Sequence, residues 1–230
     1  VTTPDGSLVA MVHCNNCTSD LNAWVNLFKE YQELLGIPVD MNEVYGKLYN
    51  NALKGNPDCG GLISYNYISG EPVTGLAEGR PLFVRSAGDK FNLANFMRAH
   101  LHASVGVLKI GNDILFNEEK IKVDRITGHG GLFKTAGVGQ RILAAAINSP
   151  ISVMETAGEG GPWGMALLAS YLVNNPKGLP LDEYLDRVVF AGNTGVEIAP
   201  TPEDVEGFNK YIENYKACLG IEEAAVNCKK

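Results

Sequence analysis

The chain has 230 residues, of which 45% are hydrophobic and 20% charged, a composition typical of a folded globular protein. Its formal net charge of −7 argues against nucleic-acid binding, which depends on clustered lysine and arginine side chains. No apolar run approaches the roughly 20 residues of a membrane span. The five cysteines are odd in number and thinly spread, which predicts a reducing, cytoplasmic setting.

The first half of the chain alternates extended and helical patterns, without a repeat or a long linker. Two segments carry apolar residues at helical spacing, and Gly36 ends the first of them. A third and longer helical pattern precedes the middle of the chain. The expected elements are a strand at Leu8–His13, helices at Leu21–Leu35 and Met41–Leu53, extended chain at Gly60–Gly70, a short strand at Leu82–Val84 and a helix at Phe91–Phe116.

Two consecutive units then follow the same order of strand, glycine turn and helix. In the first, the strand Val123–Ile126 leads to Gly128-His129-Gly130-Gly131. In the second, the strand Ile151–Met154 leads to Gly158-Glu159-Gly160-Gly161. Glycine turns at helix starts allow a flat ligand to lie against the backbone. The pattern predicts a cleft rimmed by backbone, and the alternation of strands and helices makes the fold class α/β.

The C-terminal part begins a helix with clear start signals. Thr201 suits the N-cap, Pro202 the first helical position, and Asp204 follows within the first turn. We expect this helix to pack onto the body through one apolar stripe. The stripe consists of Val205, Phe208, Ile212 and Tyr215.

These segments, taken together, resemble the C-terminal domain of the FGGY family of carbohydrate kinases, the xylulokinase and glycerol kinase group. The resemblance runs from about residue 8 to about residue 175, with the motifs in the family's order. The matching segments are Leu21–Trp24, Gly60–Glu71, Ile126–Gly131, Gln140–Ala145, Ile151–Val153 and Trp163–Ala169. The chain departs from the common xylulokinase form by a longer first glycine cluster and by Pro162-Trp163 after the second.

The resemblance implies a ribonuclease-H-like domain of the actin, hexokinase and Hsp70 superfamily, with a mixed sheet flanked by helices. It implies that residues 1–230 form a single C-terminal nucleotide-binding domain of a longer two-domain kinase, whose N-terminal domain binds the sugar and carries the catalytic Asp. The implied reaction transfers the γ-phosphate of ATP, with Mg²⁺, to a sugar or polyol hydroxyl, and a ketopentose such as xylulose is favoured. We expect the isolated chain to be inactive.

The resemblance also implies where the nucleotide binds. The glycine turns supply a backbone wall for adenosine, and the family's opening helix touches the phosphates. No catalytic or metal-binding residue is expected in this chain. The expected nucleotide-binding residues are Gly128, Gly130, Gly131, Lys134, Gly160, Gly161 and Ser19.

Some of the expected nucleotide-binding residues also have a purely structural explanation. Glycine clusters form tight turns in many proteins without ligands, and Lys134 can equally point to solvent. The second turn has a further alternative, because Gly164, Ala166 and Ala169 would suit its helix for close packing. A non-catalytic nucleotide-binding or assembly module with the same fold is the alternative function, and the oligomeric state is open, a homodimer included.

Cysteine and histidine patterns offer a weaker alternative. Cys14-Asn15-Asn16-Cys17 has the spacing of half a zinc site or of a redox pair. A second Cys or His pair at finger-like spacing is not present, and the segment follows a predicted strand rather than opening a helix. His100 and His102 diverge on one predicted helix and cannot hold one ion together. We therefore expect these residues to be structural.

Overall fold

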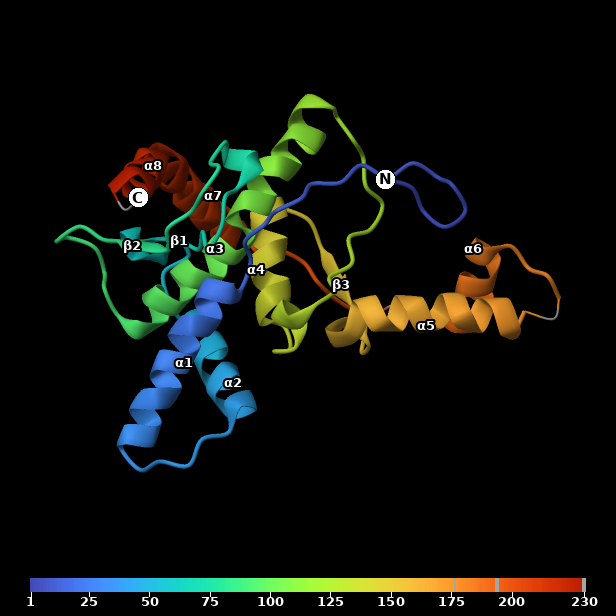
Figure 1. Cartoon of the computed structure of the whole chain (residues 1–230), viewed down its shortest axis with the longest axis horizontal. Helices are drawn as coiled ribbons and strands as arrows, with labels where there is room; N and C mark the ends of the chain where they lie inside the picture. The colour runs from blue at the N-terminus through green and yellow to red at the C-terminus, as the bar shows by residue number, and fades with distance from the viewer. Residues whose placement is uncertain (176, 193–194, 229–230) are drawn as a thin grey trace.

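The computed structural model describes residues 1–175, 177–192 and 195–228 (Figure 1). Helices α3, α4 and α7 cross in its middle, α1 and α2 project as a hairpin, and α5 extends from the other side (Figure 1). The helices are α1 (Ser19–Leu34), α2 (Met41–Ala52), α3 (Leu93–Asp113), α4 (Val138–Ile147), α5 (Gly160–Val173), α6 (Leu181–Tyr184), α7 (Pro202–Ala217) and α8 (Leu219–Cys228). The strands are β1 (Ile63–Tyr65), β2 (Leu82–Val84), β3 (Ile151–Val153) and β4 (Val196–Ile198).

The long helices confirm the periodic patterns of the sequence. Helix α1 ends just before Gly36, whose φ of +68° suits a glycine after a helix. Helix α7 begins as expected, because the Asp204 backbone N–H donates to Thr201 Oγ1 at 3.2 Å. Its apolar stripe packs inward, with Phe208 and Tyr215 fully buried. None of the described helices has the length and apolarity to cross a bilayer.

The strands agree with the prediction in part, since β2 coincides with the predicted Leu82–Val84, β3 lies within Ile151–Met154 and β1 lies within the extended segment Gly60–Gly70. The described strands form two antiparallel pairs, β1 with β2 and β3 with β4, and therefore do not confirm the expected mixed sheet. The predicted strand at Leu8–His13 is wrong, since Leu8 is 91% exposed and makes only an isolated bridge to Thr2. The predicted strand at Val123–Ile126 is wrong as well, because the only pairing there is one parallel bridge from Thr127 to Ser152.

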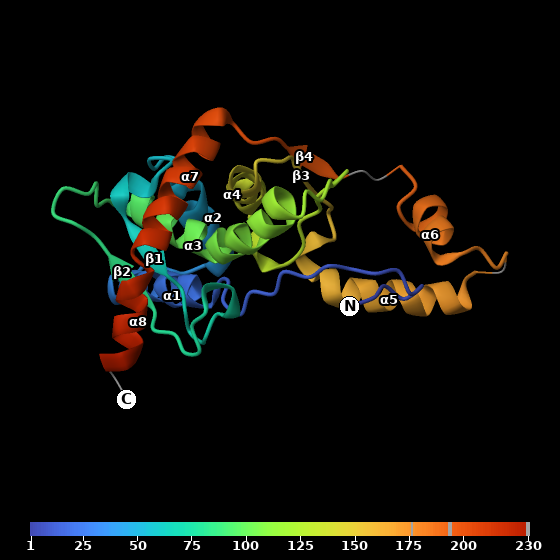
Figure 2. The ribbon, with the colours of Figure 1, turned by 90° about the horizontal axis from the view of Figure 1, so that it is seen from above.

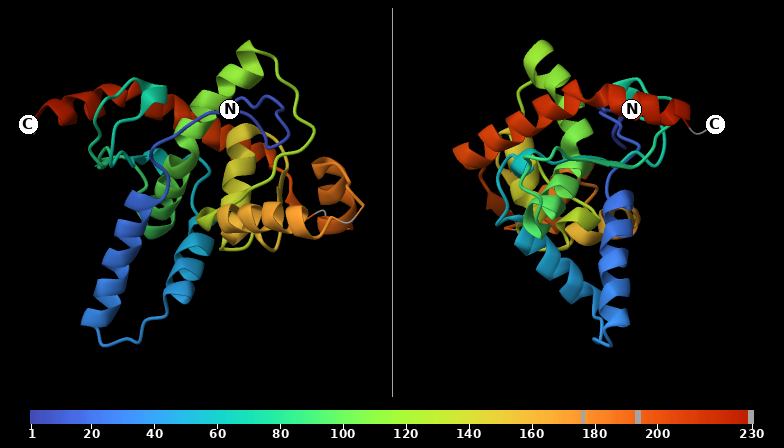
Figure 3. Two further views of the ribbon diagram at one scale, coloured as in Figure 1. Left: turned by 45° about the vertical axis from the view of Figure 1, so that its right-hand side comes forward. Right: turned by 90° about the vertical axis from the view of Figure 1, so that its left-hand side faces the viewer.

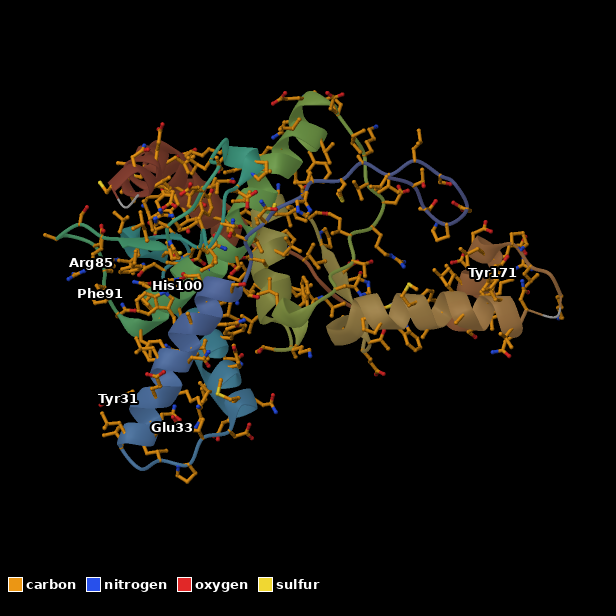
Figure 4. The ribbon with its side chains drawn as sticks, viewed as in Figure 1. Tyr31, Glu33, Arg85, Phe91, His100 and Tyr171 are labelled. Atoms are coloured by element: carbon orange, nitrogen blue, oxygen red, sulfur yellow. The ribbon has the colours of Figure 1, made fainter. Side chains whose placement is uncertain are left out.

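Helix α3 forms the centre of the core and contacts α1, α2, α4, α7 and β1. His100, which is labelled in Figure 4, and His102 are both buried and have different partners. His100 Nδ1 lies 2.8 Å from Ser64 Oγ, whereas His102 Nδ1 lies 3.4 Å from Cys59 Sγ. Burial holds the pKa of His102 well below its usual value. Within the described residues, no group of three His, Cys, Asp or Glu side chains could hold a metal ion.

Helix α5 extends away from the rest of the described chain, with α6 beside its far end (Figure 2). The alternative explanation, close packing of its small residues, has no support among the described residues, since no residue of this helix is buried and a Cβ at Gly164 would meet nothing within 4 Å. Its end is fixed to α6 instead, because Tyr171 stacks edge-on with Tyr184 at 5.3 Å between ring centroids. The exposed large apolar residues of α5 are Trp163, Met165, Leu172 and Val173.

One buried carboxylate joins three helices. Asp204 of α7 accepts from Arg98 Nη2 of α3 and from Arg141 Nε of α4, each at 2.6 Å. The side chains of Asp204 and Arg98 are both only 2% exposed. Thr201 Oγ1 also donates to Asp204, at 2.9 Å. Because a buried charge is tolerated only when it is paired and hydrogen-bonded, this cluster fixes α7 against α3 and α4.

Replacing Asp204 should therefore destabilise the fold strongly. Asp204→Ala leaves the Arg98 guanidinium buried without its partner, and we expect the free energy of unfolding to fall by about 3–5 kcal/mol. Urea unfolding at pH 7 measures this loss. The control is Glu43→Ala, which removes the carboxylate of the exposed pair with Lys47 and should cost no more than about 0.5 kcal/mol. Equal losses of unfolding free energy in the two variants would contradict the stabilising role of the buried Asp204 cluster.

The same carboxylate should make stability depend on pH. Burial alone would raise the pKa of Asp204, but hydrogen bonds from Arg141, Arg98 and Thr201 outweigh it and lower the pKa. The resulting stabilisation is present above the pKa of an unfolded aspartate, about 3.9, and is lost as the pH falls through the lowered value. Urea unfolding below about pH 5 should therefore show a shallower pH dependence in Asp204→Asn than in the unmodified protein. An identical pH dependence would contradict this role.

Candidate functional site

A hollow of about 560 Å³ lies between the α1–α2 hairpin and the first glycine turn. We call it the central hollow. Helix α2 stands on the side of the hairpin that faces α4 and α5 (Figure 3). The lining residues are Thr18, Asn22, Asn42, Tyr45, Gly46, Tyr49, Gly131, Lys134 and Thr135.

The hairpin wall of the central hollow is polar and aromatic. Tyr45 Oη donates to Asn22 Oδ1 at 2.9 Å, which ties α2 to α1. The rings of Tyr45 and Tyr49 meet edge-on, with 5.6 Å between their centroids. Gly46 lies inside α2, at a place where a Cβ would meet nothing within 4 Å. Since glycine inside a helix costs about 1 kcal/mol relative to alanine, Gly46 keeps this wall open at the expense of helix stability.

The opposite wall consists of the first glycine turn. Gly130 has φ of +107° and ψ of 179°, a conformation that is essentially restricted to glycine. Gly131 begins the short helix η4 (Gly131–Phe133), and a Cβ there would meet no atom within 4 Å. Lys134 and Thr135 follow and complete the wall. Lys134 thus places a cation beside an exposed stretch of glycine backbone.

The second glycine turn packs against the first. The Gly130 backbone N–H donates to the Ala157 carbonyl oxygen at 2.7 Å. A Cβ added at Gly158 would lie 3.1 Å from Lys134 Cε, and one at Gly160 would lie 3.1 Å from His129 Cβ. These two glycines therefore make room for side chains of the first turn.

The expected site residues are divided among three places. Gly131 and Lys134 line the central hollow, whereas Gly130, Gly160 and Gly161 line a second hollow of about 480 Å³. The rest of the second hollow consists of His129, Trp163, Gly164, Leu167 and Phe190.

Gly128 and Ser19 are not among the residues that line either hollow. Gly128 is buried, and a Cβ there would come within 2.5 Å of the Phe133 ring. Ser19 is exposed at the start of α1, next to Thr18. The binding roles of all these residues stay predictions.

The hairpin side of the central hollow was not predicted from the sequence. A signal for it exists in α2, where Tyr45 and Tyr49 are one helical turn apart and Gly46 sits within the helix without a packing reason. The partner Asn22 carries no such signal, because its bond to Tyr45 joins residues 23 apart in the chain.

The cysteines do not behave as a reactive pair. All five lie in the described part of the chain and are free. Burial, together with the charge of Glu71, raises the pKa of Cys14 to about 11, and burial also raises the pKa of Cys17. Both thiols are therefore protonated near neutral pH, which is opposite to the lowered thiol pKa of redox motifs.

The family model described as "FGGY family of carbohydrate kinases, C-terminal domain" matches residues 1–173. The chain belongs to the FGGY family. Its central hollow thus lies within the matched segment, whereas α7 and its Asp204 lie beyond it. A search of curated proteins finds no match.

Solved structures with the fold of this FGGY domain include sugar and polyol kinases. Xylulose kinase from Rhodospirillum rubrum is 18% identical with a TM-score of 0.62, over 90% of this chain and 38% of that one. Glycerol kinase from Plasmodium falciparum, solved with ADP, is 15% identical with a TM-score of 0.59. The match covers 86% of this chain and 37% of the glycerol kinase chain. Gluconate kinase from Lactobacillus acidophilus is 22% identical with a TM-score of 0.57. The match covers 74% of this chain and 34% of the gluconate kinase chain. The chain spans little more than a third of these kinases.

The geometry of the first turn predicts opposite effects on stability for its two adjacent glycines. Gly130→Val forces a branched side chain into a glycine conformation and should lower the free energy of unfolding by about 1–3 kcal/mol. Gly131→Val has a helical backbone and open space for its side chain, so its change should stay within about 0.5 kcal/mol. Urea unfolding of both variants tests this. A loss at Gly131 as large as that at Gly130 would contradict the described turn.

Proposed function

We propose that this chain is the ATP-binding half of an FGGY sugar kinase and that the central hollow holds the nucleotide. The observation that carries the proposal is the combination of size, charge and backbone exposure in this hollow. A volume of about 560 Å³ suits a ligand of this size. None of the nine described residues that line it is acidic, and Lys134 adds a positive charge. Such a lining favours a ligand with phosphate groups.

The residues of this chain bind and orient the nucleotide in the proposed reaction. Lys134 attracts the phosphate oxygens, and the backbone at Gly131 lies against the nucleotide without a side chain between them. Phosphoryl transfer depends mainly on positioning and on electrostatic stabilisation. Lys134 is kept in place because its stem crosses Gly158 of the second turn. The first turn and its support thus determine where the phosphates lie.

The expected Mg²⁺ neutralises phosphate charge when bound and is usually held by carboxylates together with substrate phosphates. The described lining of the central hollow supplies no carboxylate for it. We therefore assign no residue of this chain to the metal.

The activity of the whole kinase belongs to the same proposal. An N-terminal domain of the same polypeptide supplies the sugar pocket and the catalytic carboxylate, which fits the limited share of the solved kinases that this chain spans. The favoured substrate is a ketopentose such as xylulose, supported by the structural likeness to xylulose kinase. The sparse, odd cysteines support a cytoplasmic setting.

The isolated chain should bind nucleotide weakly and should not turn over. We expect ADP and ATP to bind in the high micromolar to millimolar range, about −4 to −6 kcal/mol, because the contacts of the other domain are missing. Amide NMR titration measures the affinity, and a coupled ADP-release assay with ketopentoses, polyols and hexuloses measures turnover. Sugar-dependent turnover at the ~1–100 per second of a whole kinase would contradict the proposal that the N-terminal domain supplies the sugar pocket and the catalytic carboxylate. Sugar-independent binding together with inactivity of the full-length protein would favour the non-catalytic module.

Two valine variants locate the nucleotide. Gly131→Val projects a side chain into the central hollow and should weaken ADP binding at least tenfold, about 1.4 kcal/mol. Gly161→Val projects into the second hollow and serves as the matched control, with binding expected to change less than threefold. The reverse order of effects would place the nucleotide in the second hollow. Unfolding curves of both variants ensure that each is folded.

A further inference from the structure

The start of helix α1 is held in place by a buried carboxylate. Glu71 is fully buried. Its Oε2 atom accepts from the Asn15 backbone N–H at 3.0 Å, from the Asn16 backbone N–H at 3.3 Å and from Asn16 Nδ2 at 3.2 Å. Hydrogen bonds to an ionised acceptor are roughly twice as strong as bonds between neutral groups. Glu71 thus fixes the entry turn, residues 15–17, directly before Thr18, the N-cap residue of α1.

Further hydrogen bonds join the entry turn to the segment that leads to Glu71. Asn16 Oδ1 accepts from the backbone N–H groups of Ile68 at 2.9 Å and Ser69 at 3.1 Å. Asn66 Nδ2 donates to the Cys17 carbonyl oxygen at 2.6 Å. Asn16 and Asn66 are both buried. The entry turn is therefore held from several sides, although it lies outside any helix or strand.

Stability alone does not explain this carboxylate. The Oε1 atom of Glu71 is buried and has no hydrogen-bond partner among the described residues. A buried polar atom without a partner costs stability. The bonds that Oε2 accepts all come from the entry turn. What Glu71 contributes is therefore the conformation of that turn.

The entry turn ends at the central hollow. Thr18 lines this hollow, and its side chain makes no capping hydrogen bond to α1. Its hydroxyl can therefore donate to a ligand oxygen. Lys134 lines the same hollow. With adenosine against the glycine turn, as the family resemblance implies, the phosphates of a bound nucleotide extend toward the start of α1, where the lining contains Thr18.

We propose that Glu71 is a positioning residue for the phosphate end of the nucleotide. Glu71 is not among the residues that line the hollow. It holds the entry turn, and the entry turn determines where Thr18 presents its hydroxyl to the phosphates. Because a hydrogen bond weakens steeply when its distance or angle departs from the optimum, a shift of this turn weakens the contact. The inference rests on the proposed function, since it concerns the same hollow and the same ligand.

Amide NMR titration with ADP tests this role at two places in the site. In the unmodified chain, ADP should shift the amide signals of both Gly131 and Ser19, the first residue of α1. In Glu71→Ala, the shift at Gly131 should persist at saturation, whereas the shift at Ser19 should fall by at least half. ADP should bind this variant about tenfold more weakly, the scale of one hydrogen bond to a charged group. A merely structural role of Glu71 would not separate the two signals.

Three further variants make the test specific. Glu71→Gln keeps an acceptor oxygen for the same N–H groups, so it should restore the Ser19 shift and bind ADP within about threefold of the unmodified chain. Glu71→Asp keeps the charge but shortens the side chain by one methylene, so it should also reduce the Ser19 shift and repeats the test if Glu71→Ala does not fold. The control Glu222→Ala removes a carboxylate that is equally buried but does not line the hollow, and it should leave both shifts unchanged.

The possible outcomes separate this inference from the proposed function. Equal losses at Gly131 and Ser19 in Glu71→Ala, or no loss at either, would overturn the role of Glu71. A shift at Gly131 without one at Ser19 in the unmodified chain would also overturn it, while leaving the nucleotide site intact. The absence of any ADP-induced shift in the hollow would overturn the proposed function, and the inference with it.

Discussion

The arrangement of this FGGY domain depends on the Asp204 carboxylate that Arg98 and Arg141 share. A carboxylate with so little exposure is stable only with both partners in place, so it fixes the relative positions of α3, α4 and α7. Helix α4 begins at Val138, after the first glycine turn and the short helix η4. Its Gln140 also donates to the carbonyl oxygens of Ile151 in β3 and Val196 in β4. The glycine wall of the central hollow is thus held by residues that the nucleotide would never touch.

The hairpin wall reaches the same central helix by a different kind of contact. Trp24 of α1 packs edge-on against Phe96 of α3, with 5.0 Å between ring centroids, and α2 makes extensive contacts with α3. One wall is therefore attached to α3 by aromatic packing and the other by a buried ion pair. The hairpin side has an ionisable contact as well, since His100 Nδ1 of α3 lies 3.6 Å from Asp20 Oδ2 of α1.

The sequence predicted the long helices and the strands at Leu82–Val84 and Ile151–Met154, whereas the strands predicted at Leu8–His13 and Val123–Ile126 are wrong, for physical reasons. Apolar spacing and caps such as Thr201 are local, so a single segment contains the whole signal. A strand needs a partner, and the apolar segment Leu8–His13 has none beyond one bridge. The candidate site shows the same difference between local signals and long-range contacts. Glycine clusters revealed the wall at Gly131, but the bond from Tyr45 to Asn22 depends on how two helices meet and has no local signature.

The two glycine clusters look alike in the sequence, yet in the structure the absence of a side chain serves a different purpose in each cluster. In the first turn, Gly130 is required by its positive φ, and Gly131 leaves backbone open toward the hollow. In the second turn, a side chain at Gly158 or Gly160 would be crowded, because Lys134 and His129 lie 3.1 Å from where its Cβ would stand. A residue other than glycine at position 158 would press on the stem of Lys134. The second cluster thus acts on the proposed nucleotide site through the position of one lysine.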